Sequence, residues 1–337
     1  MSGSIDIATV WAFILAFAVF VYVVMDGFDL GLGILFPLFP EKTDRDVIMN
    51  SVAPVWDGNE TWLVLGGGGM MAAFPLAYAV LMPALYTPII AMLLGLVFRG
   101  VAFEFRWRTT QRDRNRWDLA FAGGSWLAAL AQGIALGAIL QGVHVEGRHY
   151  AGGWWDWLTP FSILTGLALV VGYALLGACW LIMKTEGGLR DRAYGLARWL
   201  LFAMLAAIGA VSIATPFLHI QYAERWFSWP NLILTAPVPV AVAVAALLLL
   251  RSLANKNDRQ PFFLSLALFA LSYAGLGISM YPYIVPQSIT IWQAASPASS
   301  QRFMLVGVAV LIPLILGYTG WAYWVFRGKV RPGGGYH

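Results

Sequence analysis

Apolar stretches of about 20 residues recur along the whole chain, and each is long enough to cross the hydrocarbon core of a bilayer as one helix. Of the 337 residues, 60% are hydrophobic and only 11% are charged, which excludes a soluble domain. The sequence therefore predicts an all-α integral membrane protein, in which residues 1–337 form a single polytopic membrane domain. The nine predicted spans are residues 8–38, 49–73, 78–105, 118–142, 160–183, 196–219, 230–250, 261–285 and 302–326. We expect two four-helix bundles plus one peripheral helix.

The distribution of basic residues predicts how the spans are oriented. Seventeen of the 21 lysines and arginines fall in segments 39–48, 106–117, 184–198, 251–260 and 327–337, which lie on one side of a nine-span chain. Three fall on the other side and one, Arg99, lies within the third span. The positive-inside rule then places the N-terminus outside and the C-terminus in the cytoplasm. The first span has no basic segment before it, so we expect it to be retained and not cleaved as a signal peptide.

The net charge of +4 does not indicate nucleic-acid binding, because the basic residues are dispersed among loops. The single cysteine, Cys179, lies in an apolar span, so no disulfide framework can form within the chain. The expected surroundings are instead membrane lipids and other helices.

Four acidic residues interrupt the first two spans. Asp26 and Asp29 lie in the first, and Asp57 and Glu60 lie in the second. An ionisable group near the middle of a bilayer costs about 3 kcal/mol on insertion scales, so these acids must face protein or water. Residues three apart share one face of a helix. A short polar turn joins the spans, with Asp29 about ten residues before it and Asp57 about ten after it, so continuous helices place both acids roughly 15 Å below the same surface.

Arg99 reaches a similar depth in the third span and has two interpretations. It is the counter-charge for the acids, or it extends its guanidinium group to the inner interface. Glu104 and Arg106 follow at the membrane edge, where we expect both to be solvated.

The second span contains Gly66, Gly67, Gly68 and Gly69 in succession. A glycine run weakens a helix by about 1 kcal/mol per residue relative to alanine, and it is tolerated where another helix or a cofactor must come close. Either case predicts a partner surface. The four histidines lie in loops or at segment ends, without a second ligand at helical spacing, so we expect no haem or metal to be ligated by this chain.

Four motifs allow the chain to be placed beside a known family. These are Asp26–Gly31 (DGFDLG), Met49–Trp62 (MNSVAPVWDGNETW), Phe98–Arg106 (FRGVAFEFR) and Tyr281–Pro286 (YPYIVP). The chain closely resembles subunit II of cytochrome bd-type quinol oxidases, and most of all the cyanide-insensitive branch. The resemblance is strongest over 10–110 and 273–326.

The resemblance implies a heterodimer with a homologous subunit I, which would hold two b haems and a haem d, or a third b haem, and the quinol site. Subunit II would stabilise that partner, help to conduct cytoplasmic protons to an electrogenic reduction of O2, and in some members offer a route for O2 or hold a bound quinone. A small single-span third subunit is a further expected partner. Carried onto this sequence, Asp26, Asp29 and Asp57 match the acids of the proton path, and Trp62 matches a tryptophan beside the oxygen route.

Two alternatives stay open at this point. Glu60, one turn beyond Asp57, is a further station for protons or an acid with a structural hydrogen bond. The whole chain has an alternative as a stand-alone proton-coupled transporter, since such proteins also bury acids near broken helices. Transporters of that kind usually contain an internal repeat, and nothing comparable to the two acidic motifs recurs in the later spans.

Overall fold

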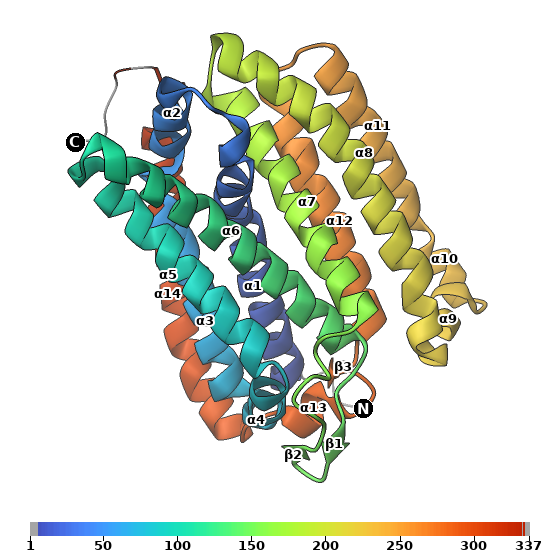
Figure 1. The fold of residues 1–337 in the computed structure, drawn as a ribbon. Coiled ribbons are helices and arrows are strands. Elements are labelled where there is room, and N and C mark those ends of the chain that lie inside the picture. The colour runs from blue at the N-terminus through green and yellow to red at the C-terminus, as the bar shows by residue number, and fades with distance from the viewer. Residues whose placement is uncertain (1–5, 332, 334–337) are drawn as a thin grey trace.

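Long, closely packed helices run side by side through the whole molecule (Figure 1). The structure is a computed structural model that describes residues 6–331 and 333. The first half contains α1 (Ile7–Leu35), the 3-10 turn η1 (Phe36–Leu38), α2 (Lys42–Val52), α3 (Trp56–Ala73), α4 (Pro75–Ala84), α5 (Tyr86–Arg108) and α6 (Gln111–Leu140). The second half contains α7 (Pro160–Lys184), α8 (Gly187–Leu218), α9 (Ile220–Phe227), α10 (Asn231–Thr235), α11 (Pro237–Ala254), α12 (Gln260–Met280), α13 (Ile291–Ala294) and α14 (Ala298–Val325).

Two short antiparallel hairpins lie at the end of the bundle where α1 begins. Strand β1 (Val145–Glu146) pairs with β2 (His149–Tyr150), and β3 (Tyr283–Val285) pairs with β4 (Ile289–Thr290). The segment 281–290, of which the sequence placed the first part in a membrane span, is therefore a hairpin beyond the end of α12.

Within the described part of the chain, eight helices are long and apolar enough to cross a membrane. This confirms the prediction of an all-α, multi-pass membrane protein. Helix α3 is not among the eight, because Asp57, Asn59 and Glu60 occupy its first two turns. The two described ends of the chain lie at opposite ends of the bundle, as an odd number of crossings requires (Figure 1). The count of nine and the grouping into two bundles stay predictions.

Prolines divide the second and third predicted spans. The prediction of one helix over 49–73 is wrong: α2 ends at Val52, residues 53–55 form a turn, and α3 begins at Trp56. Pro54 causes the break, because proline has no N–H to donate and disfavours helical geometry at the residue before it. The span predicted at 78–105 is likewise split between α4 and α5 at Leu85, where the ring of Pro88 would clash with the carbonyl of Ala84 in a continuous helix.

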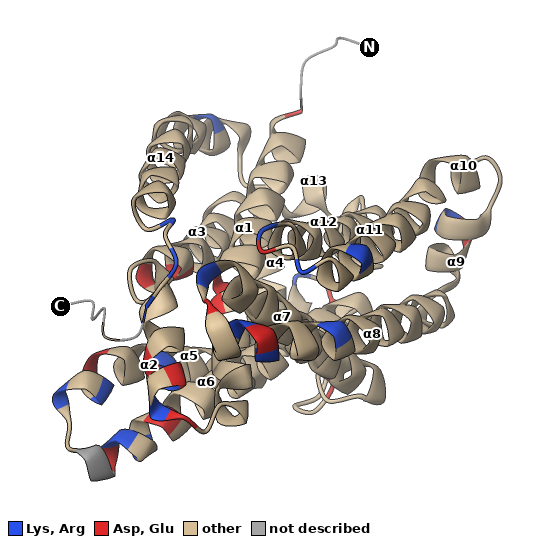
Figure 2. Ribbon diagram, turned by 90° about the horizontal axis from the view of Figure 1, so that it is seen from above, with Lys and Arg blue, Asp and Glu red and all other residues tan. Residues whose placement is uncertain are grey.

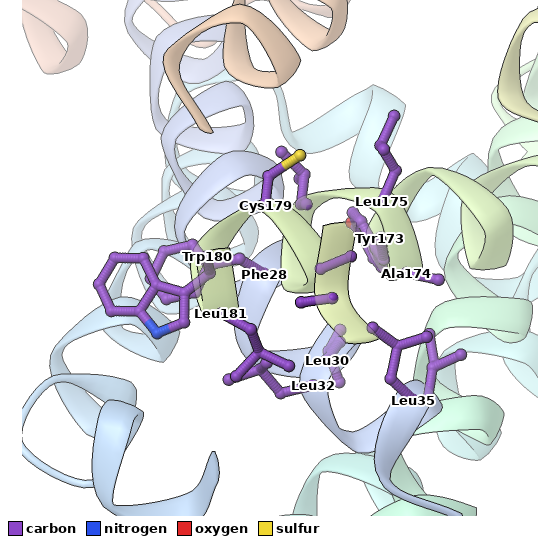
Figure 3. Packing of buried hydrophobic residues seen from close by; sticks show 14 of the residues in the cluster. Phe28, Leu30, Leu32, Leu35, Tyr173, Ala174, Leu175, Cys179, Trp180 and Leu181 are labelled. Atoms are coloured by element: carbon purple, nitrogen blue, oxygen red, sulfur yellow. The ribbon is translucent and has the colours of Figure 1, made fainter. Parts of the chain in front are cut away.

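Helices α1 and α7 form the centre of the molecule, and they approach each other through glycine. A side chain at Gly31 would collide with the backbone of Tyr173, and one at Gly177 would collide with the backbone of Gly31. Phe28 and Trp180 then stack with their ring centroids 4.2 Å apart (Figure 3). This close contact fixes the face of α1 that carries Asp26 and Asp29.

Charged residues gather at the end of the bundle that holds α2 and the C-terminal end of α14 (Figure 2). There Lys329 donates to Asp258 at 2.5 Å, while the backbone N–H of Val330 donates to the carbonyl of Lys184 at 2.8 Å. Burial raises the pKa of Asp258, but hydrogen bonds from Lys329 and Tyr194 outweigh it, so the pKa of this carboxyl lies below its usual value. These contacts hold the segment after α14 against α7 and α12. Assignment of this end to the cytoplasm stays a prediction.

Candidate functional site

Asp26 and Asp29 lie on the inner face of α1 and are completely buried. Gly27, between them, faces the ring of Tyr173 and leaves no room for a side chain, so α7 covers this turn of α1. Each carboxylate has one bound and one free oxygen. Oδ1 of Asp26 accepts from Arg99 at 2.5 Å, and Oδ2 of Asp29 accepts from Nδ2 of Asn59 at 2.8 Å. Asp26 Oδ2 and Asp29 Oδ1 are buried without a protein partner among the described residues.

Arg99 on α5 joins α1 to α3. Its guanidinium group is fully buried and forms ion pairs with Asp26 through Nη1 and with Glu60 through Nη2. A side chain that reached for the interface would be exposed, so the structure places Arg99 as the counter-charge and not as a snorkelling residue. Gly95, one turn earlier on α5, and Gly124 on α6 allow these two helices to touch through their backbones. The guanidinium is therefore held inside protein.

Glu60 connects this buried site to the surface of α3. Its side chain is 27% exposed, whereas those of Asp26 and Arg99 are not exposed at all. Three carboxyl groups, from Asp26, Asp29 and Glu60, thus surround one arginine. Burying charges that have no partner is costly, and interacting acids share protons between them. The site therefore sets three carboxyl groups beside a single positive charge.

Asn59 and Tyr323 complete the site, and neither was predicted from the sequence. The hydroxyl of Tyr323 on α14 donates to Oδ1 of Asn59 at 2.9 Å, and Asn59 in turn donates to Asp29. This chain of hydrogen bonds connects the last long helix to the first. The available signal was position: Asn59 lies on the same face of α3 as Trp62 and Gly66, the face that packs on α1.

Asp57 does not join the buried acids. It lies in the first turn of α3 and is exposed, on the same outward face as Thr61 and Val64. The prediction that Asp57 lies level with Asp29 assumed one continuous helix. The turn at residues 53–55 breaks that helix, so Asp57 stands at the start of α3 instead. Asn59, two residues later, occupies the position against Asp29 that we expected an acid to fill.

Arg106 corrects another expectation. The sequence predicted a solvated side chain at the membrane edge, yet Arg106 is completely buried, while Glu104 is exposed as expected. Nε of Arg106 donates to Asp118 at 2.5 Å and Nη1 donates to Asp46 at 2.7 Å. This second ionic cluster joins α2, α5 and α6. The signal was the heptad spacing from Arg99, which returns Arg106 to the inward face of α5.

The four glycines of the run 66–69 face two sides of α3, two of them toward α1 and two of them away from the chain. Gly66 and Gly69 face Val19 and Leu15 of α1, and a side chain at Gly69 would collide with Leu15. Gly67 and Gly68 face open space, with nothing of this chain within 4 Å of a side chain placed there. Trp62 lies on the α1 side, 1% exposed, with its ring edge-on to Phe17. Half of the run thus packs within the chain and half forms an open strip.

The three described histidines lie in a hairpin, in a loop and at a helix boundary. His219 bonds through Nε2 to the carbonyl of Gln141 at 2.7 Å, and His144 is exposed beside Glu146. His149 is in the β1–β2 hairpin, and His337 lies outside the described residues. In that part of the chain no group of three or more His, Cys, Asp or Glu side chains could hold a metal ion. That this chain ligates no haem or metal stays a prediction.

Membrane helices that gather two buried carboxyl groups and one partly exposed carboxyl group around a buried arginine define a class: a polytopic membrane protein with an ion-paired acidic site within its helical bundle. Residues 7–326 match the family described as Cytochrome bd terminal oxidase subunit II, and the chain belongs to that family. It is a multi-pass inner membrane protein and one subunit of a terminal oxidase complex.

Similar proteins match along nearly their whole lengths. The chain is 29% identical to cytochrome bd-I ubiquinol oxidase subunit 2 of Escherichia coli K12 over 95% of this chain and 94% of that protein. It is 28% identical to cytochrome bd ubiquinol oxidase subunit 2 of Bacillus subtilis 168, over 94% of this chain and 95% of that protein. A chain in the structure of bd oxidase from Geobacillus thermodenitrificans has the same fold, with a TM-score of 0.71, 18% identity and coverage of 95% of this chain and 99% of that one.

Proposed function

We propose that this subunit carries protons from the cytoplasmic side toward a haem-bearing subunit I, where quinol is oxidised and O2 is reduced to water. The observation that supports this most is the set of three carboxyl groups around buried Arg99, two of which keep an oxygen that no described residue binds. Ion pairing alone would need fewer acids. Family membership favours an oxidase subunit over a stand-alone transporter.

The order of groups suggests a path from surface to interior. Asp57 is exposed on α3, Glu60 follows one turn later and is partly exposed, and Arg99 joins Glu60 to buried Asp26. Reduction of O2 to two waters takes up four protons, and drawing them from the inside makes the reaction electrogenic. Each charge moved across the full potential is worth about 2.3 kcal/mol per 100 mV.

The partner would cover the outward face of α3 and α14. Long apolar side chains of α14 are exposed along its length, among them Phe303, Val306, Leu314 and Trp321. Gly67 and Gly68 leave space beside them for a neighbouring helix to approach closely. In this proposal subunit I holds the haems, which are b and d or b alone. The complex would also contain a bound quinone and a route for O2 near Trp62. Any small third subunit would dock on another face.

The acids of α3 test the proton path. In the assembled complex, Glu60→Gln and Asp57→Asn are expected to slow O2 consumption, because an amide cannot carry a proton along the path, and to leave the haem absorption spectra unchanged. Asp191→Asn is the control, since Asp191 is exposed at the charged end of the bundle and forms an ion pair at 3.7 Å with Lys256, away from the buried acids. Loss of haem in Glu60→Gln would instead give Glu60 a structural role, and full turnover in both variants would contradict the path.

The open glycines test the partner surface. Gly67→Leu is expected to reduce the amount of subunit I that co-purifies with this chain, because the added side chain occupies the space the partner needs. Gly209→Leu is the matched control, because Gly209 is equally open within this chain but belongs to α8, which lies on the opposite side of the bundle from α3 (Figure 1). Equal recovery of subunit I with both variants would place the interface elsewhere.

A further inference from the structure

A second hydrogen-bonded chain, which the proton path above does not use, leads from α7 toward Asp26. The hydroxyl of Tyr173 on α7 donates to Oε1 of Gln132 on α6 at 2.8 Å. Nε2 of Gln132 donates to the hydroxyl oxygen of Tyr22 on α1 at 2.7 Å. Tyr22 is 4% exposed and Tyr173 is completely buried. Three helices thus contribute to a polar row inside an apolar bundle.

The hydrogen bonds of this row all run in one direction, from Tyr173 to Gln132 to Tyr22, and the Tyr22 hydroxyl is the last donor. Because Tyr22 accepts from Gln132, its own O–H proton is free to be donated. Asp26 follows Tyr22 by four residues, on the same face of α1, and the two side chains interact. Oδ2 of Asp26 is the buried carboxylate oxygen without a hydrogen-bond partner among the described residues. A carboxylate can only accept, so Tyr22 offers a free donor one helical turn away from an acceptor that has no partner.

We propose that Tyr22 is a positioning residue for Asp26: oriented by Gln132 and Tyr173, its hydroxyl donates to Oδ2 and sets how tightly that carboxyl holds a proton. The inference rests on the proposed function, in which Asp26 takes part in proton transfer. The opposite orientation of the Gln132 amide would turn the Tyr22 hydroxyl toward Gln132 and leave Oδ2 unpaired. A buried unpaired oxygen is the more costly arrangement, which favours the orientation described.

Several other groups also act on Asp26, and a change at Tyr22 must be measured against them. Arg99 on α5 contacts it directly, and the remaining charged or titratable neighbours on the helices around it are Asp29 on α1, Glu60 on α3, Tyr173 on α7 and Tyr323 on α14. None of these changes in a Tyr22→Phe variant, which removes one hydroxyl oxygen and keeps the ring.

The test is infrared spectroscopy of the assembled complex over a range of pH. The band of the protonated Asp26 carboxyl is assigned by its loss in Asp26→Asn. In Tyr22→Phe we expect the band to change frequency. The pH at which the band reaches half of its full intensity should rise by about one unit, because a hydrogen bond to the charged form of the carboxyl is lost. Gln132→Leu, which frees the Tyr22 hydroxyl to turn elsewhere, is expected to shift it in the same direction. The pH profile of O2 consumption should move with it.

Tyr273→Phe on α12 is the matched control. Its hydroxyl is also inside the membrane part of the bundle, but it donates to the carbonyl of Ala16 at 2.9 Å and has no contact with Asp26. An unchanged band and pH profile in both Tyr22→Phe and Gln132→Leu, in a complex where Asp26→Asn slows turnover, would overturn the inference alone. Full turnover in Asp26→Asn would overturn the proposed function, and this inference with it.

Discussion

Replacement of Arg99 by methionine is expected to lower the stability of the assembled protein by about 3–5 kcal/mol. Arg99 is completely buried and is the only cation that pairs with Asp26 and Glu60 in the described chain. Methionine fills a similar volume, but it leaves two carboxyl groups beside each other without a positive charge, and a charge without a partner in a bilayer interior is costly. The measurement is the thermal unfolding of the purified complex.

Two further variants show whether the loss comes from charge. Arg108→Met is the control on the same helix, because the side chain of Arg108 is 80% exposed in its pair with Glu104, and a surface pair contributes about 1 kcal/mol or less. Adding Asp26→Asn to Arg99→Met should recover part of the stability, since contacting residues do not act additively. If Arg99→Met unfolds like Arg108→Met, the buried cluster does not stabilise the fold.

Helix positions were predictable from the sequence because length and hydropathy determine them, whereas helix breaks were not. The first, fifth and ninth spans were predicted to within a few residues of α1, α7 and α14. The break after Val52 depends on Pro54, which lies in sequence that is otherwise apolar enough to continue. Hydropathy averages over such a residue, so the second span came out as one helix and α2 was missed.

Charged site residues were predictable from the sequence, whereas neutral residues, and residues whose position depends on a helix break, were not. Charged residues inside apolar sequence are conspicuous, and so Asp26, Asp29, Glu60 and Arg99 were all named as candidates. The structure brings Arg99 into contact with Asp26 and Glu60. Asp57 was expected to be buried with them but is exposed, because its position depends on where α3 begins. Asn59 is neutral and tolerated in many settings, so only its position on the face of α3 that carries Trp62 and Gly66 could have marked it as the partner of Asp29.

Contacts between distant helices were the least accessible to sequence analysis. Tyr323 reaches Asn59 across 264 positions of the chain, and Tyr22 reaches Gln132 across 110. A tyrosine in a membrane helix usually indicates the interface, where its ring and hydroxyl each find a suitable environment. Here the hydroxyls bond inward instead, and only the packing of α1, α6, α7 and α14 reveals it.

Asp26→Asn is expected to slow O2 reduction by about a hundredfold, the size of effect that a positioned proton-transfer group usually has. Asparagine keeps the shape of aspartate and accepts from Arg99, but it cannot take up and release a proton. The haem absorption spectra should stay unchanged, because the substitution alters one atom and no haem contact is expected in this chain. The measurements are O2 consumption with excess quinol and proton uptake from the inner side of vesicles that contain the complex.

Asp258→Asn is the matched control for this prediction. Asp258 is also a hydrogen-bonded acid, with Arg190 and Lys329 as partners, but it lies in the connection between α11 and α12 and has no contact with Asp26. It should therefore keep normal turnover. A normal rate in Asp26→Asn, with protons still taken up from the inner side, would show that protons pass Arg99 by another route. Glu60 and Asp29 would then be the pair to examine, because both lie at the same site and Asp29 has its own free oxygen. A slow rate in both Asp26→Asn and Asp258→Asn would point instead to a general loss of negative charge, in which case the position of Asp26 beside Arg99 would not matter.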